Sequence, residues 1–117
     1  MKIYNDKQIL EHSIETAVQF LQDGGVIGFP TETYYGLGVD PCNEKAVRRL
    51  FLVKQREINK PILLLVKDLE MLSRFVDVIP VIYEPLLKKF WPGPLTLLFP
   101  WKDTVSNLLT GGTGTVG

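Results

Sequence analysis

Proline and glycine cut this sequence into short apolar segments, and this punctuation limits the folds open to it. The segments 26–29, 62–66 and 95–99 hold at most five residues each, and each is bounded by a proline or a glycine. Such segments are typical of short buried strands. Helical patterns separate them, and strands alternating with helices are typical of folds in which helices cover a sheet. The sequence therefore predicts an α/β or α+β domain.

Polar residues mark where the predicted helices begin. Asn5, Asn43 and Asp68 can each accept a hydrogen bond from a backbone N–H of a first helical turn. Pro85 is expected in the first turn of a fourth helix, because an interior proline would cost about 3 kcal/mol. The predicted helices are one between Asn5 and Gly24, one from 43 to about 54, one at 69–76 and one around 85–90.

Length, composition and charge exclude several classes of protein. The chain has 117 residues, of which 45% are apolar and 22% charged, so one globular domain over 1–117 is expected. Thirteen basic residues balance thirteen acidic ones, so no overall positive field favours nucleic acid. The longest aliphatic run, 62–66, is too short to cross a membrane, and the N-terminus lacks a secretion signal. One cysteine rules out an internal disulfide, which favours the cytoplasm.

The single histidine and single cysteine exclude further chemistry. His12 and Cys42 are too few for a multi-ligand zinc site, so no protein-held metal is predicted. A Ser-His-Asp or Cys-His triad would have to use His12. Because His12 lies two residues after Leu10 on a predicted helix, it falls on the polar side of that helix. We therefore expect His12 to be exposed and Cys42 to take no part in catalysis.

The segment 30–38, Pro-Thr-Glu-Thr-Tyr-Tyr-Gly-Leu-Gly, is the first candidate site. It follows a predicted strand directly, and loops after strands are where α/β proteins usually bind ligands. Thr31, Glu32 and Thr33 supply two hydroxyls and a carboxylate. The two glycines would let a ligand approach the backbone or allow a positive φ. The alternative is an ordinary polar connection from a strand to a helix. In either case we expect a loop from residue 31 to residue 41.

A cationic connector follows the second predicted helix and is the second candidate site. Lys54 stands at the predicted C-terminus of that helix, where the helix dipole favours a cation. Arg56 and Lys60 lie beyond the helix beside one acid, Glu57. Arginine and lysine in such a cluster can bind phosphates. The alternative is a solvated basic loop without a ligand.

The C-terminal tract 112–117 formally matches the dinucleotide pattern G-x-G-x-x-G. That pattern needs a strand before it, a helix after it and an acid about 20 residues further on. No clear strand ends at Gly111, so we do not predict a dinucleotide site. A Gly/Thr loop that enters a further strand is the better interpretation, and Thr115 stays a candidate for contact with phosphate.

Four blocks follow one another along the chain: residues 30–38, Lys54-Gln55-Arg56, Lys60-Pro61 and residues 90–96. Taken in this order, they resemble the YrdC-like domain, the family of L-threonylcarbamoyladenylate synthases. The resemblance implies a twisted, open, mixed α/β sheet with flanking helices and a central cavity. It also implies a reaction of L-threonine, bicarbonate and ATP that releases pyrophosphate and serves threonylcarbamoylation of tRNA, together with the partner proteins of that pathway.

Where residues match, the resemblance implies roles for them. Thr33 matches a threonine that contacts the amino-acid substrate, and Thr31 and Tyr35 are further candidates for substrate binding. Lys54 and Arg56 match a pair that faces the ATP phosphates, and these two are the candidate catalytic residues. Catalysis would rest on positioning and charge stabilisation, with Mg²⁺ on the phosphates. The candidate nucleotide-binding residues are Lys54, Arg56, Lys60 and Thr115.

The sequence departs from the family pattern in two ways. Leu65 stands where many relatives have a threonine-contacting histidine. The chain also ends before the family's Val-Arg strand and Ser-x-Asn motif, so we expect the N-terminal portion of a family domain, without full activity. A nucleotide-binding or double-stranded-RNA-binding paralogue without synthase activity is the alternative. A hydrogenase-maturation carbamoyltransferase fits less well, because its zinc-finger and acylphosphatase-like flanks are absent.

Overall fold

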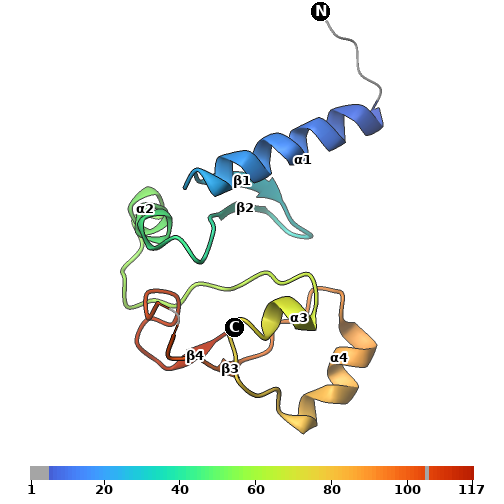
Figure 1. Ribbon diagram of the computed structural model, residues 1–117, viewed down its shortest axis with the longest axis vertical. Helices are drawn as coiled ribbons and strands as arrows, with labels where there is room; N and C mark the ends of the chain where they lie inside the picture. Colours follow the sequence, from blue (N-terminus) through green and yellow to red (C-terminus); the bar gives the residue numbers. More distant parts are fainter. Residues whose placement is uncertain (1–5, 105) are drawn as a thin grey trace, which may run out of the picture. The chain divides into compact units, whose positions relative to one another are not determined.

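A computed structural model describes residues 6–104 and 106–117 of the chain, which forms two compact units, Met1–Lys54 and Gln55–Gly117 (Figure 1). Helices and short strands occur in both units, which confirms the mixed α/β class. In chain order the elements are α1 (Asp6–Gln22), β1 (Ile27–Pro30), β2 (Tyr35–Gly38), α2 (Glu44–Lys54), α3 (Leu69–Leu72), the 3-10 helix η1 (Val81–Tyr83), α4 (Glu84–Phe90), β3 (Phe99–Pro100) and β4 (Thr115–Val116).

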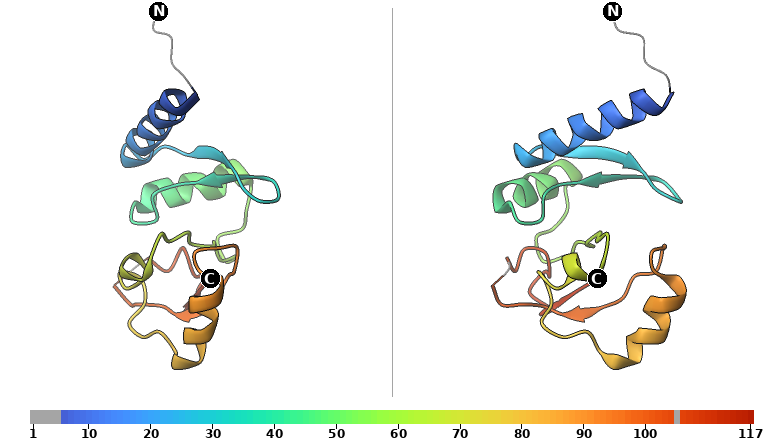
Figure 2. Two further views of the ribbon diagram at one scale, coloured as in Figure 1. Left: turned by 90° about the vertical axis from the view of Figure 1, so that its right-hand side faces the viewer. Right: turned by 45° about the vertical axis from the view of Figure 1, so that its right-hand side comes forward.

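In the first unit, α1 is followed by an antiparallel hairpin of β1 and β2 (Figure 2). The chain leaves α1 through Gly24, whose φ of +81° is a conformation that glycine adopts readily. The prediction of a helix before Gly24 is confirmed, whereas its predicted cap, Asn5, lies outside the described residues. His12 is exposed on α1, as the helical spacing predicts.

The loop predicted for 31–41 is wrong in part, because Tyr35–Gly38 forms β2. The register pairs Ile27 with Gly38 and Pro30 with Tyr35, so the chain folds straight back along β1. A glycine-rich segment has weak strand propensity of its own, and here it becomes a strand by pairing with β1. The polar segment therefore lies at the tip of a hairpin, and it does not lead from a strand into a helix.

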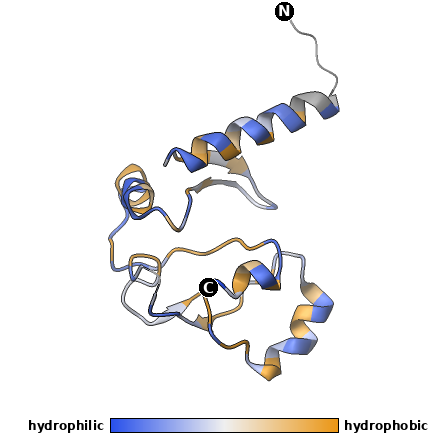
Figure 3. Ribbon diagram, in the orientation of Figure 1, coloured by the Kyte–Doolittle hydropathy of each residue, from blue (hydrophilic) through white to orange (hydrophobic). Residues whose placement is uncertain are grey.

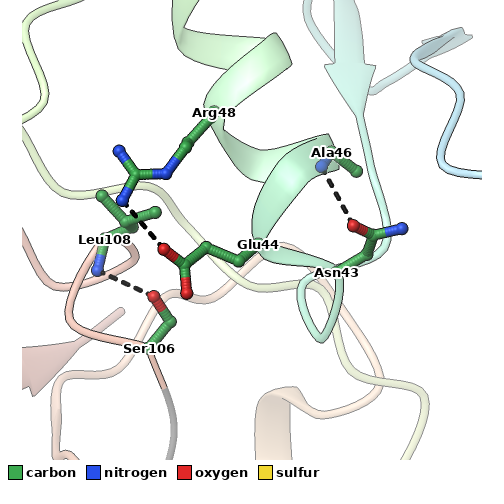
Figure 4. A network of polar contacts seen from close by, with 6 residues as sticks. All are labelled: Asn43, Glu44, Ala46, Arg48, Ser106 and Leu108. Atoms are coloured by element: carbon green, nitrogen blue, oxygen red, sulfur yellow. Dashed lines mark hydrogen bonds and ion pairs between the residues drawn. The ribbon is translucent and has the colours of Figure 1, made fainter.

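Local capping sets the start of α2. The Ala46 N–H donates to Asn43 Oδ1 at 3.1 Å, which confirms the predicted cap (Figure 4). Glu44 and Arg48 form an exposed ion pair at 2.8 Å one turn apart. The apolar face of α2 is buried, and the helix ends at Lys54 as predicted.

Two short helices of the second unit begin as the sequence predicts. The Met71 N–H donates to Asp68 Oδ1 at 2.8 Å, so Asp68 caps α3. The helix predicted for 69–76 is too long, because α3 ends at Leu72 and the Ser73 hydroxyl then donates to the Glu70 carbonyl. Pro85 lies in the first turn of α4, where the missing N–H costs nothing.

The second unit contains one short ladder, in which β4 pairs antiparallel with β3. Outside this ladder, the Leu64 N–H donates to the Gly117 carbonyl at 2.8 Å, and the Ile62 N–H donates to the Leu109 carbonyl at 3.0 Å. Residues 62–66 are an unbroken apolar run (Figure 3). Alternate residues of this run are half-buried and exposed, which is the alternation of a strand.

Two strand predictions therefore fail in different ways. Residues 62–66 belong to no strand, so that prediction is wrong, and the strand predicted at 95–99 is too long, because only Phe99 of it belongs to β3. A strand needs a partner along its length, and the described ladders are two separate antiparallel pairs, β1–β2 and β3–β4.

Aromatic side chains pack together in the core of the second unit. Phe75 stacks on Trp101 with ring centroids 6.0 Å apart, and Tyr83 meets Phe99 edge to face at 5.3 Å. Trp91 also contacts Phe99 and donates from its indole N–H to the Leu95 carbonyl at 2.9 Å. The 90–96 block thus forms a packed corner. Within the described part of the chain, none of the helices combines the length and the hydropathy that a membrane span requires.

Candidate functional site

The loop from Thr31 to Tyr34 closes the tip of the hairpin and carries the first set of candidate residues. The Thr31 N–H donates to the Tyr34 carbonyl at 3.2 Å, and the Thr31 hydroxyl donates to the same oxygen. The Thr33 N–H donates to Thr31 Oγ1 at 3.3 Å, and the two hydroxyl oxygens lie 3.4 Å apart. The structure thus brings the two predicted threonines into direct contact, and both are exposed.

The glycines of β2 have a different role from the one predicted. Gly36 and Gly38 do not adopt a positive φ. A Cβ on Gly36 would lie 3.2 Å from the Phe29 ring, and a Cβ on Gly38 would lie 2.9 Å from it. These glycines are therefore needed because the aromatic ring of β1 packs across them, and this packing fixes the hairpin that presents the loop. The sequence alone could not predict this role, because it depends on the strand register that pairs Phe29 with Gly36.

Two tyrosines at the hairpin tip extend into solvent. Tyr34 is 86% exposed and Tyr35 is 82% exposed. Glu32 is exposed beside them. The tip therefore presents exposed hydroxyls, a carboxylate and aromatic rings, and the rest of the hairpin does not cover them.

The cationic connector begins where α2 ends. Lys54 is the last residue of α2, and Gln55 turns the chain with a φ of +50°. One N–H of the Arg56 guanidinium donates to the Pro61 carbonyl at 2.9 Å. Lys60 Nζ lies 3.9 Å from a carboxylate oxygen of Glu57, and both side chains are largely exposed. Since a guanidinium carries five N–H donors, this bond to the Pro61 carbonyl fixes Arg56 and uses one of them.

The Gly/Thr tract lies against this connector within the second unit. Gly111, at a φ of +61°, touches the backbone of Asn59 so closely that a Cβ there would overlap the Asn59 carbonyl oxygen. The chain then turns through Gly112 and Gly114, both at positive φ, and enters β4 at Thr115. This arrangement confirms the prediction of a Gly/Thr loop leading into a further strand.

Threonine hydroxyls form hydrogen bonds within that turn. One of these threonines, Thr113, was not among the residues predicted from the sequence. Thr110 is fully buried, and its carbonyl accepts from the Thr113 hydroxyl at 2.7 Å. Thr113 Oγ1 also accepts from the Thr115 N–H at 3.3 Å and lies 3.2 Å from the Thr115 hydroxyl. Thr113 therefore shapes the surroundings of Thr115. The alternation of threonine and glycine in this tract is the signal that could have identified it.

Thr33 belongs to the first unit, whereas Arg56, Lys60 and Thr115 belong to the second. Joint action of these residues on one ligand therefore stays a prediction.

Among residues 6–104 and 106–117, no three His, Cys, Asp or Glu side chains gather in a way that could hold a metal ion.

Comparison with known proteins identifies the family. The family model Sua5_yciO_yrdC, described as "Telomere recombination", matches residues 19–117 and so includes the hairpin, the connector and the Gly/Thr tract. The chain belongs to the Sua5/YciO/YrdC family. This confirms the resemblance to the YrdC-like domain.

Relatives in this family carry one recurring name. A protein of Pyrococcus abyssi named threonylcarbamoyl-AMP synthase is 41% identical over 94% of this chain and 32% of its own length. A Vibrio vulnificus protein of the same name is 38% identical over 89% of this chain and 57% of its own length. The crystal structure of P. abyssi Sua5 complexed with L-threonine superposes with a TM-score of 0.85 at 42% identity, over 91% of this chain and 31% of that one. The chain thus spans between about a third and three fifths of these relatives.

Proposed function

We propose that this chain is part of an L-threonylcarbamoyladenylate synthase. The observation that carries the proposal is the identity of 38–41% with proteins named threonylcarbamoyl-AMP synthase over about nine tenths of the chain. A family member of similar sequence has also been crystallised with L-threonine. The product would serve threonylcarbamoylation of tRNA, and the chain would act in the cytoplasm as a nucleotidyltransferase.

The proposed reaction joins three substrates in two steps. The amino group of L-threonine reacts with bicarbonate and loses water, which gives a carbamate. A carbamate oxygen then attacks the α-phosphorus of ATP, and the bond from that phosphorus to the pyrophosphate oxygen breaks. Neither step needs a histidine or cysteine base, because positioning and stabilisation of the leaving pyrophosphate supply the catalysis.

The residues divide between the two ends of this reaction. We assign binding of L-threonine to the hairpin tip, where Thr33 and Tyr35 are both exposed, one on each side of Tyr34 in the sequence. We assign the ATP phosphates to Lys54, Arg56 and Lys60, whose positive charges would neutralise the pyrophosphate as it leaves. The contact of Arg56 with the Pro61 carbonyl supports this assignment, since it fixes the guanidinium and a neutral carbonyl does not cancel its positive charge.

Thr115 and Mg²⁺ complete the proposed nucleotide site. Thr115 is exposed at the start of β4, where its hydroxyl can reach a phosphate. Mg²⁺ usually binds through substrate phosphates together with one or two carboxylates. When bound to ATP, Mg²⁺ would neutralise phosphate charge, and Glu32 is the carboxylate of the candidate segment.

Release of pyrophosphate tests the proposal. The protein is incubated with ATP, Mg²⁺ and bicarbonate, with and without L-threonine, both as the 117-residue chain and as the complete product of its gene. We expect the complete product to release pyrophosphate only when L-threonine and bicarbonate are both present. Release without threonine would contradict the synthase proposal. Retention of nucleotide or RNA without any release would instead support a binding module.

A further inference from the structure

The cationic connector contains one tight turn, at residues 57–60, with an acidic residue at one end and a basic residue at the other. The Lys60 N–H donates to the Glu57 carbonyl at 3.1 Å, which closes the turn. Lys60 Nζ and Glu57 Oε2 lie 3.9 Å apart across it. Arg56 lies just before the turn and donates to the Pro61 carbonyl just after it. Two of the cations assigned to phosphate are therefore placed at the two ends of one turn.

These two cations differ in the partner that each already has. Arg56 bonds to a neutral carbonyl, which does not cancel its positive charge. Lys60 lies beside a carboxylate, which compensates its charge in part. Glu57 is the one acidic residue in the sequence from 54 to 61, where it stands among three cations. A phosphate that binds Lys60 therefore meets a lysine that already has an anionic partner.

The ion pair between Glu57 and Lys60 is weak enough for a ligand to replace it. At 3.9 Å the two atoms are too far apart for a hydrogen bond, and the side chains of Glu57 and Lys60 are 69% and 55% exposed. Exposed pairs of this kind change an equilibrium by no more than about fivefold. Because a polyphosphate carries several negative charges, it attracts the ammonium group more strongly than a single carboxylate does.

We propose that Glu57 sets the affinity of the phosphate site by competing with the ligand for Lys60. The carboxylate pairs with Lys60 in the free protein, and the ammonium group changes partner when a polyphosphate binds. Glu57 thereby lowers the affinity for the pyrophosphate that the reaction releases, and its return to Lys60 favours departure of this product. The inference rests on the proposed function, because it takes Lys60 as a ligand of phosphate.

The turn itself does not depend on the Glu57 carboxylate. The hydrogen bond that closes the turn joins two backbone atoms, and the bond from Arg56 to Pro61 encloses it. Gly111 packs against the backbone of Asn59 within the turn. Glu57→Gln should therefore keep the turn and remove only the negative charge.

A double-mutant cycle on the binding of pyrophosphate and of ATP tests this inference. Titration calorimetry compares the full chain with Glu57→Gln, Lys60→Gln and the variant that carries both substitutions. We expect Glu57→Gln to strengthen binding of both ligands about two- to fivefold, and to have no effect when Lys60→Gln is already present. A gain of the same size with and without Lys60→Gln would show that Glu57 only repels the ligand, and would overturn the inference.

Glu70→Gln is the matched control for this change. Glu70 is an exposed acid in the first turn of α3, so its substitution changes the net charge of the second unit by the same amount, outside the connector. It should leave both affinities nearly unchanged, because salt screens exposed charges at a distance. If Glu70→Gln strengthened binding as much as Glu57→Gln, net charge alone would explain the gain, which would contradict the inference.

Failure of the proposed function can be told apart from failure of this inference. Binding of pyrophosphate to the 117-residue chain needs neither L-threonine nor bicarbonate. Coupling in the cycle without any threonine-dependent release of pyrophosphate would support the inference and contradict the synthase proposal. Threonine-dependent release with additive effects in the cycle would overturn the inference alone. If the chain binds neither pyrophosphate nor ATP, the connector is no phosphate site and the inference is wrong, while the release assay still decides the reaction.

Discussion

Arg56→Ala is expected to abolish ATP binding while leaving the melting temperature nearly unchanged. A charge-assisted hydrogen bond contributes roughly 1.5–3 kcal/mol, so loss of a bidentate contact to phosphate corresponds to about a 100-fold loss of affinity or more. The bond from Arg56 to the Pro61 carbonyl is exposed, so water can replace it when the side chain is removed, and its loss should cost only about 1 kcal/mol of stability. Calorimetry with ATP and thermal unfolding by circular dichroism measure the two effects on the same samples.

Two further variants sharpen this result. Arg74→Ala removes the same charge from another exposed position of the second unit and should leave ATP binding within about twofold. Arg56→Lys keeps the charge but loses the planar fork, so its affinity should fall between those of Arg56→Ala and the original chain. A large drop in melting temperature for Arg56→Ala would identify Arg56 as structural, and equal losses for Arg56→Ala and Arg74→Ala would indicate general electrostatic attraction.

Gly111→Ala is expected to be the most destabilising single change in the second unit. A Cβ at this position would overlap the Asn59 carbonyl oxygen and lie 2.9 Å from its carbonyl carbon and 3.0 Å from the Pro61 nitrogen. These are backbone atoms, which cannot move aside as a flexible side chain can. The connector that carries Arg56 and Lys60 must therefore shift, and we expect a loss of several kcal/mol together with weaker ATP binding.

Gly112→Ala is the matched control for this change. Gly112 also has a positive φ, of +81°, but nothing lies within 4 Å of a Cβ placed there. Its substitution should cost only the left-handed backbone penalty, about 1–2 kcal/mol. The difference between the two variants in urea unfolding isolates the contact with Asn59. Equal destabilisation of both variants would mean that this contact is not what requires glycine at position 111.

The features predicted best are those set by neighbours in the sequence. Asn43 and Asp68 cap helices through residues three positions away, and Lys54 ends α2 where the cations of the connector begin. Each of these depends on hydrogen bonds within one turn, so sequence spacing is enough to find them. The length of α3 was missed, because the Ser73 hydroxyl bonds to a backbone carbonyl and ends the helix early.

The features missed depend on residues far apart in the sequence. β2 is a strand because it pairs with β1, and its glycines are needed because the Phe29 ring packs across them. Residues 62–66 have the pattern of a strand but form only two backbone hydrogen bonds to the C-terminal segment. The apolar stripe of α1 is likewise exposed, with Leu10 61% and Ile14 53% exposed. Periodicity identifies such a face, and it does not show what packs against it.

In the candidate site, too, the sequence identified the residues but not the contacts that they make. The sequence identified Thr31 and Thr33 as a pair of hydroxyls, but only the structure shows that the Thr31 hydroxyl bonds to the Tyr34 carbonyl and the Thr33 N–H within the loop. Likewise, the sequence identified the cations Arg56 and Lys60 of the connector. Only the structure shows that Gly111 of the Gly/Thr tract approaches the connector closely, at Asn59.

The identity of the reaction product tests the proposed function most directly. The complete product of the gene is incubated with tritiated L-threonine, bicarbonate and ATP labelled at the α-phosphate, and the products are separated by chromatography. If the hairpin tip binds threonine and the cationic connector binds ATP in one reaction, both labels will appear in equal amounts in a single compound. That compound will be lost in both Thr33→Val and Arg56→Ala. Labels that stay on separate molecules would contradict the synthase proposal.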